Sequence, residues 1–206
     1  MAKHTRPLLI TLAVVVLLGG GVLVFKNLPQ DFFFGLKQDI QLARVGPTLS
    51  ESKPLLLRIP ALNINAPIIE LGLQDNKEIE IPEGYEEVGW YRHGPTPGEL
   101  GPAVVVGHVD SYEGAAVFYS LGQLKPGDLI EIDREDGTTA LFEVKILERY
   151  PQDDFPTEKV YGNIDHAGLL LITCSGSYDR EAERYNRNLV VYASLVEPVA
   201  GESPEE

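Results

Sequence analysis

Cysteine is nearly absent from this chain, because Cys174 is the only one among 206 residues. A single thiol cannot form an internal disulfide, and it excludes zinc or iron–sulfur sites that need several cysteines. Basic residues are scarce as well: 17 Lys and Arg stand against 31 Asp and Glu, a formal net charge of −14. Because nucleic-acid binding needs clustered basic side chains, the composition argues against a nucleic-acid partner.

One long run carries no charge, residues 8–25 (LLITLAVVVLLGGGVLVF). About 18 apolar residues can cross a bilayer as a helix, so we predict a single transmembrane helix here. Lys3 and Arg6 precede the run, and the positive-inside rule then makes residues 1–7 a cytoplasmic tail and places the rest outside the cell. A cleaved signal peptide is the alternative, but the run is longer than a usual signal core and no small-residue cleavage site follows it.

The remaining chain divides into a linker at 26–53, a folded domain at 54–197 and an acidic tail at 198–206 that we expect to be disordered. The domain is all-β by pattern: short Val-, Ile- and Leu-rich runs separated by turn signals predict a closed β-barrel of about seven to eight strands with short helices. A Gly- and Pro-rich stretch around Trp90 is predicted to be an ordered loop. The predicted strands lie near 55–59, 66–71, 102–108, 128–133, 138–149, 168–174 and 188–196, the helices near 114–122 and 157–161, and the loop at 82–101.

The single cysteine ends the apolar run GLLLITC, residues 168–174. A small buried core residue is one interpretation. Outside the cytoplasm, however, a lone thiol is exposed to oxidation, and Ala or Val would fill a core position without that liability. The position therefore favours a nucleophile at a strand end. Since only the thiolate is nucleophilic, such a residue needs a base or a cation close by.

Two other residues could meet that need. His108 ends the run AVVVGH, where a strand could hold an imidazole at the mouth of the barrel; a partly buried structural histidine is the alternative. Arg187 directly precedes the run NLVVYAS, and it would lie close to Cys174 if 168–174 and 188–196 are neighbouring strands. A guanidinium there could stabilise an oxyanion, although a solvated strand-edge charge is equally compatible. For Asp110 and the other carboxylates we expect solvated positions.

These stretches, in this order, resemble the sortases, membrane-anchored cysteine transpeptidases of bacterial cell surfaces. The resemblance covers about residues 54–197 and rests on LLLRIPALNINAPI, GPAVVVGHVDS, LLITCSG and RNLVVYA. It implies a sortase-like barrel with Cys174 as nucleophile, His108 as acid–base partner and Arg187 as the group that holds the oxyanion and positions the substrate. The stretch at 88–128 is most similar to class F sortases.

The resemblance also implies a reaction. A secreted protein with a C-terminal sorting motif similar to Leu-Pro-any-Thr-Gly (LPXTG) would be cleaved between Thr and Gly through a thioester at Cys174. The amine of a peptidoglycan precursor would then accept the acyl group, at the outer face of the cell membrane and without cofactor or metal. Two other functions stay open: a cysteine hydrolase that uses water as acceptor, and a membrane-anchored β-domain that binds a partner without catalysis.

Overall fold

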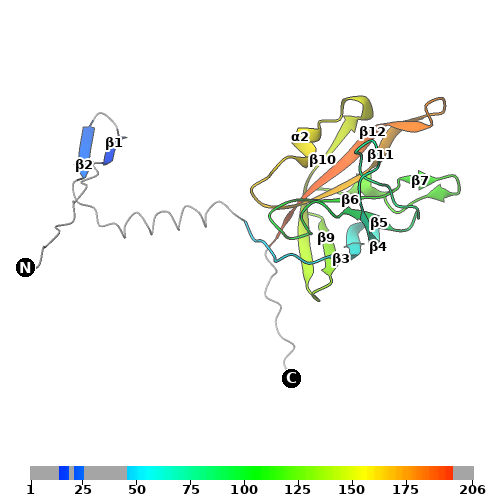
Figure 1. The fold of residues 1–206 in the computed structure, drawn as a ribbon, viewed down its shortest axis with the longest axis horizontal. Coiled ribbons are helices and arrows are strands. Elements are labelled where there is room, and N and C mark those ends of the chain that lie inside the picture. Colours follow the sequence, from blue (N-terminus) through cyan, green and yellow to red (C-terminus); the bar gives the residue numbers. More distant parts are fainter. Residues whose placement is uncertain (1–13, 19–20, 26–45, 197–206) are drawn as a thin grey trace, which may run out of the picture. The chain divides into compact units, whose positions relative to one another are not determined.

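A computed structural model describes residues 14–18, 21–25 and 46–196 of the chain (Figure 1). By their internal contacts the residues form two separate units, Met1–Arg44 and Val45–Glu206. The predicted acidic tail lies outside the described residues, as does most of the predicted linker.

The first unit contains two short antiparallel strands, β1 (Val14–Leu18) and β2 (Gly21–Phe25). Both fall within residues 8–25, so the structure differs there from the predicted helix. The physical reason is local: valine favours strands, and two glycines separate the runs at hairpin spacing. The rest of the run, 8–13 and 19–20, lies outside the described residues, and the membrane-spanning segment as a whole stays a prediction. In the described part of the chain we find no helix that is long and apolar enough to span a bilayer.

The second unit is a closed barrel in which eight strands follow one another in the order β10-β12-β11-β6-β5-β4-β3-β9, and β9 pairs with β10 to complete the ring. This confirms the predicted all-β barrel. The barrel strands are β3 (Pro54–Ile59), β4 (Ile64–Leu71), β5 (Val88–Tyr91), β6 (Gly101–Val106), β9 (Leu129–Arg134), β10 (Thr139–Pro151), β11 (Ala167–Asp179) and β12 (Arg184–Leu195). The smaller elements are β7 (Asp110–Ser111), β8 (Gly114–Ala115), α2 (Thr157–Tyr161) and the 3₁₀ turns η1 (Pro60–Leu62), η2 (Leu121–Gln123) and η3 (Gln152–Asp154).

Every predicted strand is present, and the helix predicted at 157–161 is α2. The helix predicted at 114–122 is wrong. Its backbone instead makes hydrogen bonds to distant segments of the same chain. The Val117 N–H donates to the Tyr85 carbonyl (2.9 Å), and the Phe118 N–H donates to the His108 carbonyl (2.9 Å). These bonds replace the intrahelical ones, and only the 3₁₀ turn η2 forms at the end of the segment.

Strand β5 lies inside the stretch that we predicted to be a loop. It is short, pairs with β4 on one side and β6 on the other, and carries Trp90 into the barrel core, where the indole is 4% exposed. Gly89 allows the close packing, because a Cβ at this position would lie 2.1 Å from the Leu71 side chain. The predicted loop at 82–101 therefore contains a strand, and its tryptophan is part of the barrel core.

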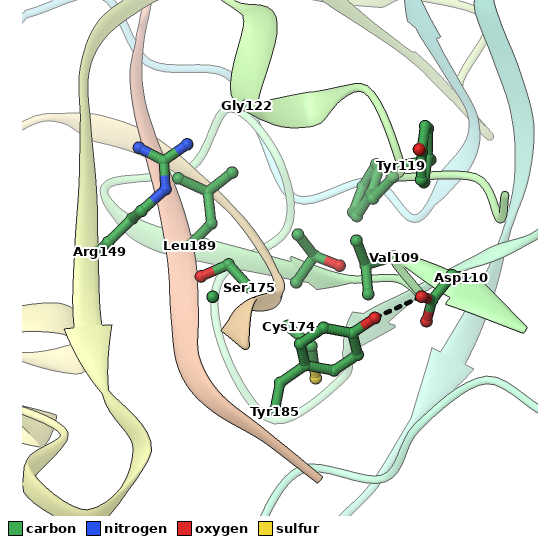
Figure 2. Close-up of a pocket in the computed structure, with 12 residues that line it drawn as sticks. Val109, Asp110, Tyr119, Gly122, Arg149, Cys174, Ser175, Tyr185 and Leu189 are labelled. Carbon is green, nitrogen blue, oxygen red and sulfur yellow. Dashed lines mark hydrogen bonds between the residues drawn. The ribbon is translucent and has the colours of Figure 1, made fainter. Parts of the chain in front are cut away.

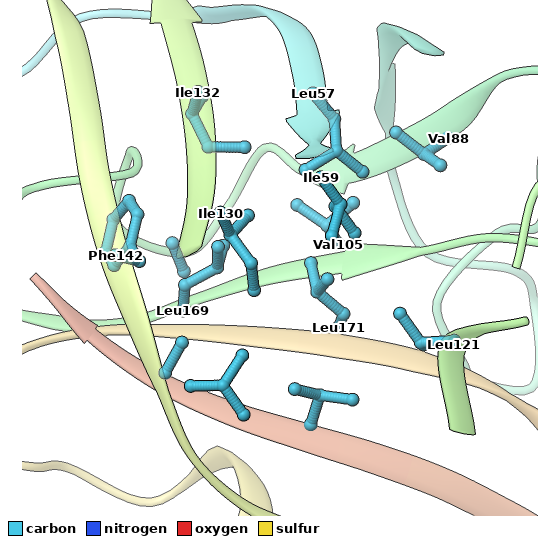
Figure 3. Close-up of a cluster of buried hydrophobic side chains, with 14 of the residues drawn as sticks. Leu57, Ile59, Val88, Val105, Leu121, Ile130, Ile132, Phe142, Leu169 and Leu171 are labelled. Carbon is cyan, nitrogen blue, oxygen red and sulfur yellow. The ribbon is translucent and has the colours of Figure 1, made fainter. Parts of the chain in front are cut away.

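Two apolar clusters hold the domain together, one inside the barrel and one on its outer face. Alternate residues of β11 divide between them, as strand geometry requires: Leu169 and Leu171 point into the barrel (Figure 3), and Leu170 and Ile172 point outward. The outer cluster includes Val160 of α2 and Phe155, so the segment from η3 to α2 covers this face. Burying each large side chain contributes roughly 1.5–3 kcal/mol.

Strands β6 and β11 are parallel neighbours, and this pairing positions the site. Their register runs from Ala167 opposite Gly101 to Ile172 opposite Val106. The Gly107 N–H then donates to the Ile172 carbonyl at 3.2 Å. Because parallel strands end at the same rim, the residues after β6 lie beside the continuation of β11.

Candidate active site at the rim of β6 and β11

Cys174 lies on β11 just beyond the last residue paired with β6, and its side chain is half-buried. The strand bends directly afterwards, because its register with β12 shifts between Ser175 and Tyr178. Gly176 permits this bulge: its φ is +84°, and a Cβ there would lie 2.2 Å from the Asn186 Oδ1. The thiol therefore lies where the regular apolar part of the strand ends, as predicted, but β11 itself continues beyond the bulge to Asp179.

The thiol-bearing residue lines a pocket of about 280 Å³ between β11, β12 and the loop that follows β6 (Figure 2). Two hydroxyl oxygens on the pocket wall, Thr173 Oγ1 and Ser175 Oγ, are buried and have no hydrogen-bond partner among the described residues. A concave, partly apolar pocket with a few unsatisfied polar groups is typical of a ligand site. The lining residues are Val109, Asp110, Phe118, Tyr119, Gly122, Arg149, Thr173, Cys174, Ser175, Gly176, Tyr185 and Leu189.

The surroundings of the thiol keep it protonated. Burial raises the pKa of Cys174, and the negative charge of Asp110 raises it further, while a hydrogen bond from Gln152 acts in the opposite direction. The net direction is upward from the ordinary value, so the resting protein carries a neutral thiol at neutral pH.

Asp110 is held in the pocket by Tyr185. The tyrosine hydroxyl donates a short hydrogen bond to Asp110 Oδ2, shown as the dashed line in Figure 2, and this bond raises the pKa of Tyr185 to about 12. Both side chains are partly buried. The expectation that Asp110 is a solvated surface carboxylate is therefore wrong: the hairpin formed by β7 and β8 turns it toward β12.

Two amide side chains lie next to the thiol. Asn188 is the residue of β12 directly opposite Cys174. Gln152, in η3, directs its Nε2 to both residues, at 3.0 Å from Asn188 Oδ1 and 3.8 Å from Cys174 Sγ. Sequence reasoning missed both amides, because only the strand register and the fold-back of η3 reveal them.

His108 follows β6 after Gly107 and is half-buried, which agrees with its predicted place at the mouth of the barrel. Its Nε2 lies 2.8 Å from the Pro82 carbonyl oxygen, and its ring packs 4.8 Å from the Tyr85 ring, centroid to centroid. A carbonyl only accepts, so Nε2 carries the proton and Nδ1 is the free acceptor of the neutral ring. Within the described residues no hydrogen bond joins this imidazole to the Cys174 thiol.

Arg187 is not the cross-strand partner of the thiol-bearing residue. It lies opposite Ser175, not Cys174, and it is exposed. Along β12 it belongs to the same alternating set as Leu189 and Val191, which point into the barrel, whereas Cys174 belongs to the outward set. Leu189 and Ser175 nevertheless line the same pocket as Cys174, and no side-chain hydrogen bond or salt bridge of Arg187 is found within residues 46–196.

Comparison with known proteins identifies the domain. A family model described as a sortase domain matches residues 57–196. A search of curated proteins found no match. Among solved structures, sortase A from Corynebacterium diphtheriae has a TM-score of 0.56 at 19% identity, with 84% of this chain and 86% of that chain covered.

Two further structures give the same fold. Sortase C-1 from Actinomyces oris has a TM-score of 0.55 at 23% identity, over 71% of this chain and 74% of that chain. The complex of Streptococcus agalactiae sortase C1 with MTSET has a TM-score of 0.54 at 20% identity, over 71% and 69%. At these identities the likeness shows the fold alone.

Proposed function

The chain belongs to the sortase family, and we propose that it is a cysteine transpeptidase that cleaves an LPXTG-like sorting motif between Thr and Gly and transfers the protein to an amine of a peptidoglycan precursor. The observation that carries the proposal is the position of the only cysteine, half-buried in a pocket at the rim where β6 ends before His108. Within the family we assign the chain to class F, on the sequence of residues 88–128.

The proposed cycle begins with the neutral thiol. The unprotonated Nδ1 of His108 takes the proton of Cys174 as the substrate enters, and the thiolate sulfur attacks the threonine carbonyl carbon. The tetrahedral intermediate collapses, the C–N bond breaks, and the imidazolium returns the proton to the leaving glycine amine. The acceptor amine then attacks the thioester carbonyl while His108 takes its proton. The C–S bond breaks, and the imidazolium returns that proton to the released sulfur of Cys174.

Electrostatics favour a cationic acceptor. Asp110 places a carboxylate in the pocket that Cys174 lines, and the chain as a whole is strongly acidic. An ammonium group is attracted to such a field before it loses its proton. The same carboxylate disfavours the thiolate, so the enzyme at rest is protected from adventitious thiol chemistry and depends on His108 for activation.

The proposal is tested by incubating the full chain, in detergent, with a library of sorting-motif peptides and an amine acceptor, and by following products with mass spectrometry. Cys174→Ala should abolish cleavage and the thioester adduct. His108→Ala should lower the rate by about 10²–10⁴-fold, because general acid–base catalysis contributes that much. His93→Ala, the same change at an exposed loop histidine, is the matched control.

Three outcomes contradict the proposal in different ways. Cleavage by Cys174→Ala would place the nucleophile elsewhere. Peptide cleaved only to the free acid, whatever amine is added, would make the protein a hydrolase. Peptide bound but never cleaved by the unsubstituted protein would make it a binding domain.

We also propose that residues 8–25 anchor the protein in the cell membrane with the catalytic domain outside. The uncharged run and the preceding basic residues support this. The full chain should sediment with membranes and resist extraction by high salt, and protease added to intact cells should degrade the barrel domain. A salt-extractable chain, or one that the protease cannot reach, would overturn the placement.

A further inference from the structure

We propose that Asp110 and Tyr185 form the subsite that receives the acceptor amine, as an ammonium ion, beside Cys174. Asp110 supplies the negative charge and a hydrogen-bond acceptor, and Tyr185 holds that carboxylate and contributes an aromatic ring. The inference rests on the proposed acyl transfer and deepens it, because it names the residues that select a cationic amine over water as the second substrate.

Asp110 and Tyr185 reach the pocket of Cys174 from two other elements. Asp110 belongs to β7 and Tyr185 to β12, and both line the pocket that Cys174 of β11 lines (Figure 2). Burial and then the charge of Asp110 raise the pKa of Cys174, while the pKa of Tyr185 is raised by its hydrogen bond to Asp110, by burial and by the charges of Asp110 and Cys174. Charge effects of this kind require groups that lie close together. A cation bound at Asp110 is therefore beside the thioester that Cys174 would carry.

The Asp110 carboxylate has no cationic partner in the described part of the chain. It is partly buried, and Tyr185 donates its hydroxyl hydrogen to Oδ2. Within the described residues Oδ1 accepts no hydrogen bond, and no salt bridge of Asp110 is found. The other charged residue of the lining, Arg149 of β10, lies on the opposite side of the pocket in Figure 2. A partly buried carboxylate without a cation favours a cationic ligand.

Tyrosine rings lie beside this carboxylate. The Tyr185 ring packs edge-to-face against the Tyr178 ring, with centroids 5.3 Å apart and an interplanar angle of 69°. Tyr119, which is 62% exposed, lines the same pocket. The faces of tyrosine rings attract ammonium groups. A carboxylate next to such rings therefore binds a protonated amine in preference to an uncharged ligand such as water.

Two unsatisfied hydroxyls in the pocket wall indicate a polar occupant. Thr173 Oγ1 and Ser175 Oγ are buried and have no hydrogen-bond partner among the described residues, and Thr173 as a whole is 4% exposed. An unmade hydrogen bond of a buried group costs free energy, so such a group requires a ligand or a water molecule that completes it. Like Asp110 Oδ1, both oxygens can accept an N–H, and a protonated amine carries several N–H donors.

The transfer step balances with water as the first proton acceptor. The bound ammonium gives one proton to solvent water, and the neutral amine keeps an N–H donated to Asp110 while its lone pair turns toward the thioester carbon. The C–N bond forms and the C–S bond breaks. The second amine proton passes to His108, which returns it to the sulfur of Cys174. Asp110 therefore binds the second substrate and exchanges no proton in the step.

Two fates of one acyl-enzyme test the subsite. The full chain, in detergent, receives a sorting-motif peptide that it cleaves and glycinamide, whose amino group is mostly protonated at about pH 7. Mass spectrometry measures the ratio of transfer product to free acid, and because both products come from the same thioester, a change in the thiol pKa cancels. Asp110→Asn should lower this ratio about tenfold or more, since a hydrogen bond to a charged group is lost. Tyr185→Phe should lower it less, by about threefold, because the carboxylate stays but is no longer held.

Three controls separate recognition of the charge from general damage to the site. Hydroxylamine is uncharged at neutral pH, so its transfer ratio should fall far less in Asp110→Asn than that of glycinamide does. Asp110→Glu, which keeps the charge, should retain more transfer to glycinamide than Asp110→Asn. Asp75→Asn, the same change at an exposed carboxylate after β4, should leave both ratios unchanged. An unaltered glycinamide ratio in Asp110→Asn, or an equal loss with hydroxylamine, overturns the inference.

Thiol labelling gives a second measurement, which does not need turnover. A cation bound at Asp110 offsets the charge that raises the pKa of Cys174, so it should move the pH profile of labelling by methyl methanethiosulfonate, an uncharged reagent, to lower pH. The probe is propylamine, which, like a lysine side chain, stays protonated to about pH 10. It should shift the profile of the unsubstituted protein and not that of Asp110→Asn, and the uncharged N-propylacetamide should shift neither.

The two measurements fail separately. A labelling profile that propylamine leaves unchanged in the unsubstituted protein overturns the subsite. If that protein cleaves no peptide, the proposed function fails, and the labelling profile still decides whether Asp110 binds an ammonium ion.

Discussion

At the scale of single residues, the site is defined by what surrounds one sulfur. Burial and the Asp110 carboxylate both raise the pKa of Cys174, so the proposed reaction requires that the thiolate form only when the substrate enters. The register of β11 with β12 then decides which residues are its cross-strand neighbours. Asn188 lies directly opposite Cys174, and Arg187 lies opposite Ser175.

Asp110→Asn should lower the pKa of Cys174, because it removes a negative charge that raises that pKa. Thiol labelling should therefore begin at lower pH than in the unsubstituted protein, and the measurement is the labelling rate across pH 6–10. Tyr185→Phe is the matched control: it removes the hydrogen bond to Asp110 and keeps the carboxylate charge. If Asp110→Asn labels at the same pH as the unsubstituted protein, burial alone accounts for the raised value.

At the scale of elements, the segment from η3 to α2 covers the outer face beside the thiol. Its packing depends on aromatic contacts, with the Phe155 ring 5.8 Å from the Tyr150 ring and 5.8 Å from the Tyr161 ring. Lys159 also bridges to Glu148 at 2.7 Å, across from α2 to β10. The segment that holds Gln152 is attached to the barrel by these contacts and by the salt bridge from Arg184 of β12 to Asp153 at 2.7 Å.

Phe155→Ala should loosen this segment, because both ring contacts are lost together with buried apolar area. Hydrogen exchange at 152–161 should accelerate, while the exchange of barrel amides stays as it was. The pH profile of Cys174 labelling should shift to higher pH, because the Gln152 hydrogen bond, which lowers the pKa of Cys174, is weakened. Tyr112→Ala, at a ring that is 98% exposed, serves as control. Unaltered exchange at 152–161 would mean that the covering segment is held by its backbone alone.

Most strands could be predicted from the sequence, but the residues that contact the thiol from other elements could not. The strands β6, β11 and β12 could be predicted from short continuous apolar runs bounded by turn signals, and the thiol was placed at the end of one of these runs. Strand β5 was missed, since four residues between Gly- and Pro-rich stretches carry no periodic signal. The neighbours Asn188 and Gln152 depend on cross-strand register and on the fold-back of η3, and a register error of one residue exchanges Asn188 for Arg187. No local pattern contains that information.

At the scale of the whole domain, the apolar cluster inside the barrel contacts strands on both sides of the β9–β10 pairing that completes the ring. Phe142 of β10 lies opposite Ile130 of β9 and Leu195 of β12, and its ring is 0% exposed. It therefore packs where the ring of strands closes.

Phe142→Ala should lower the free energy of unfolding by about 3–5 kcal/mol, the range for truncating a buried aromatic side chain. The measurement is urea denaturation followed by circular dichroism. Leu129→Ala, at a neighbouring strand residue that is 42% exposed, should cost less than about 1 kcal/mol. Equal losses of unfolding free energy for the two variants would mean that Phe142 does not pack in the cluster inside the barrel.

The parallel pairing of β6 with β11 has a consequence for how the protein matures. The strands β9 and β10 lie between them in the chain, and β12 must still join β11 before Asn188 can face Cys174. Such non-local pairing makes folding slow and places it late in synthesis. A nascent chain therefore has no assembled site around Cys174 until β12, Arg184–Leu195, has been synthesised.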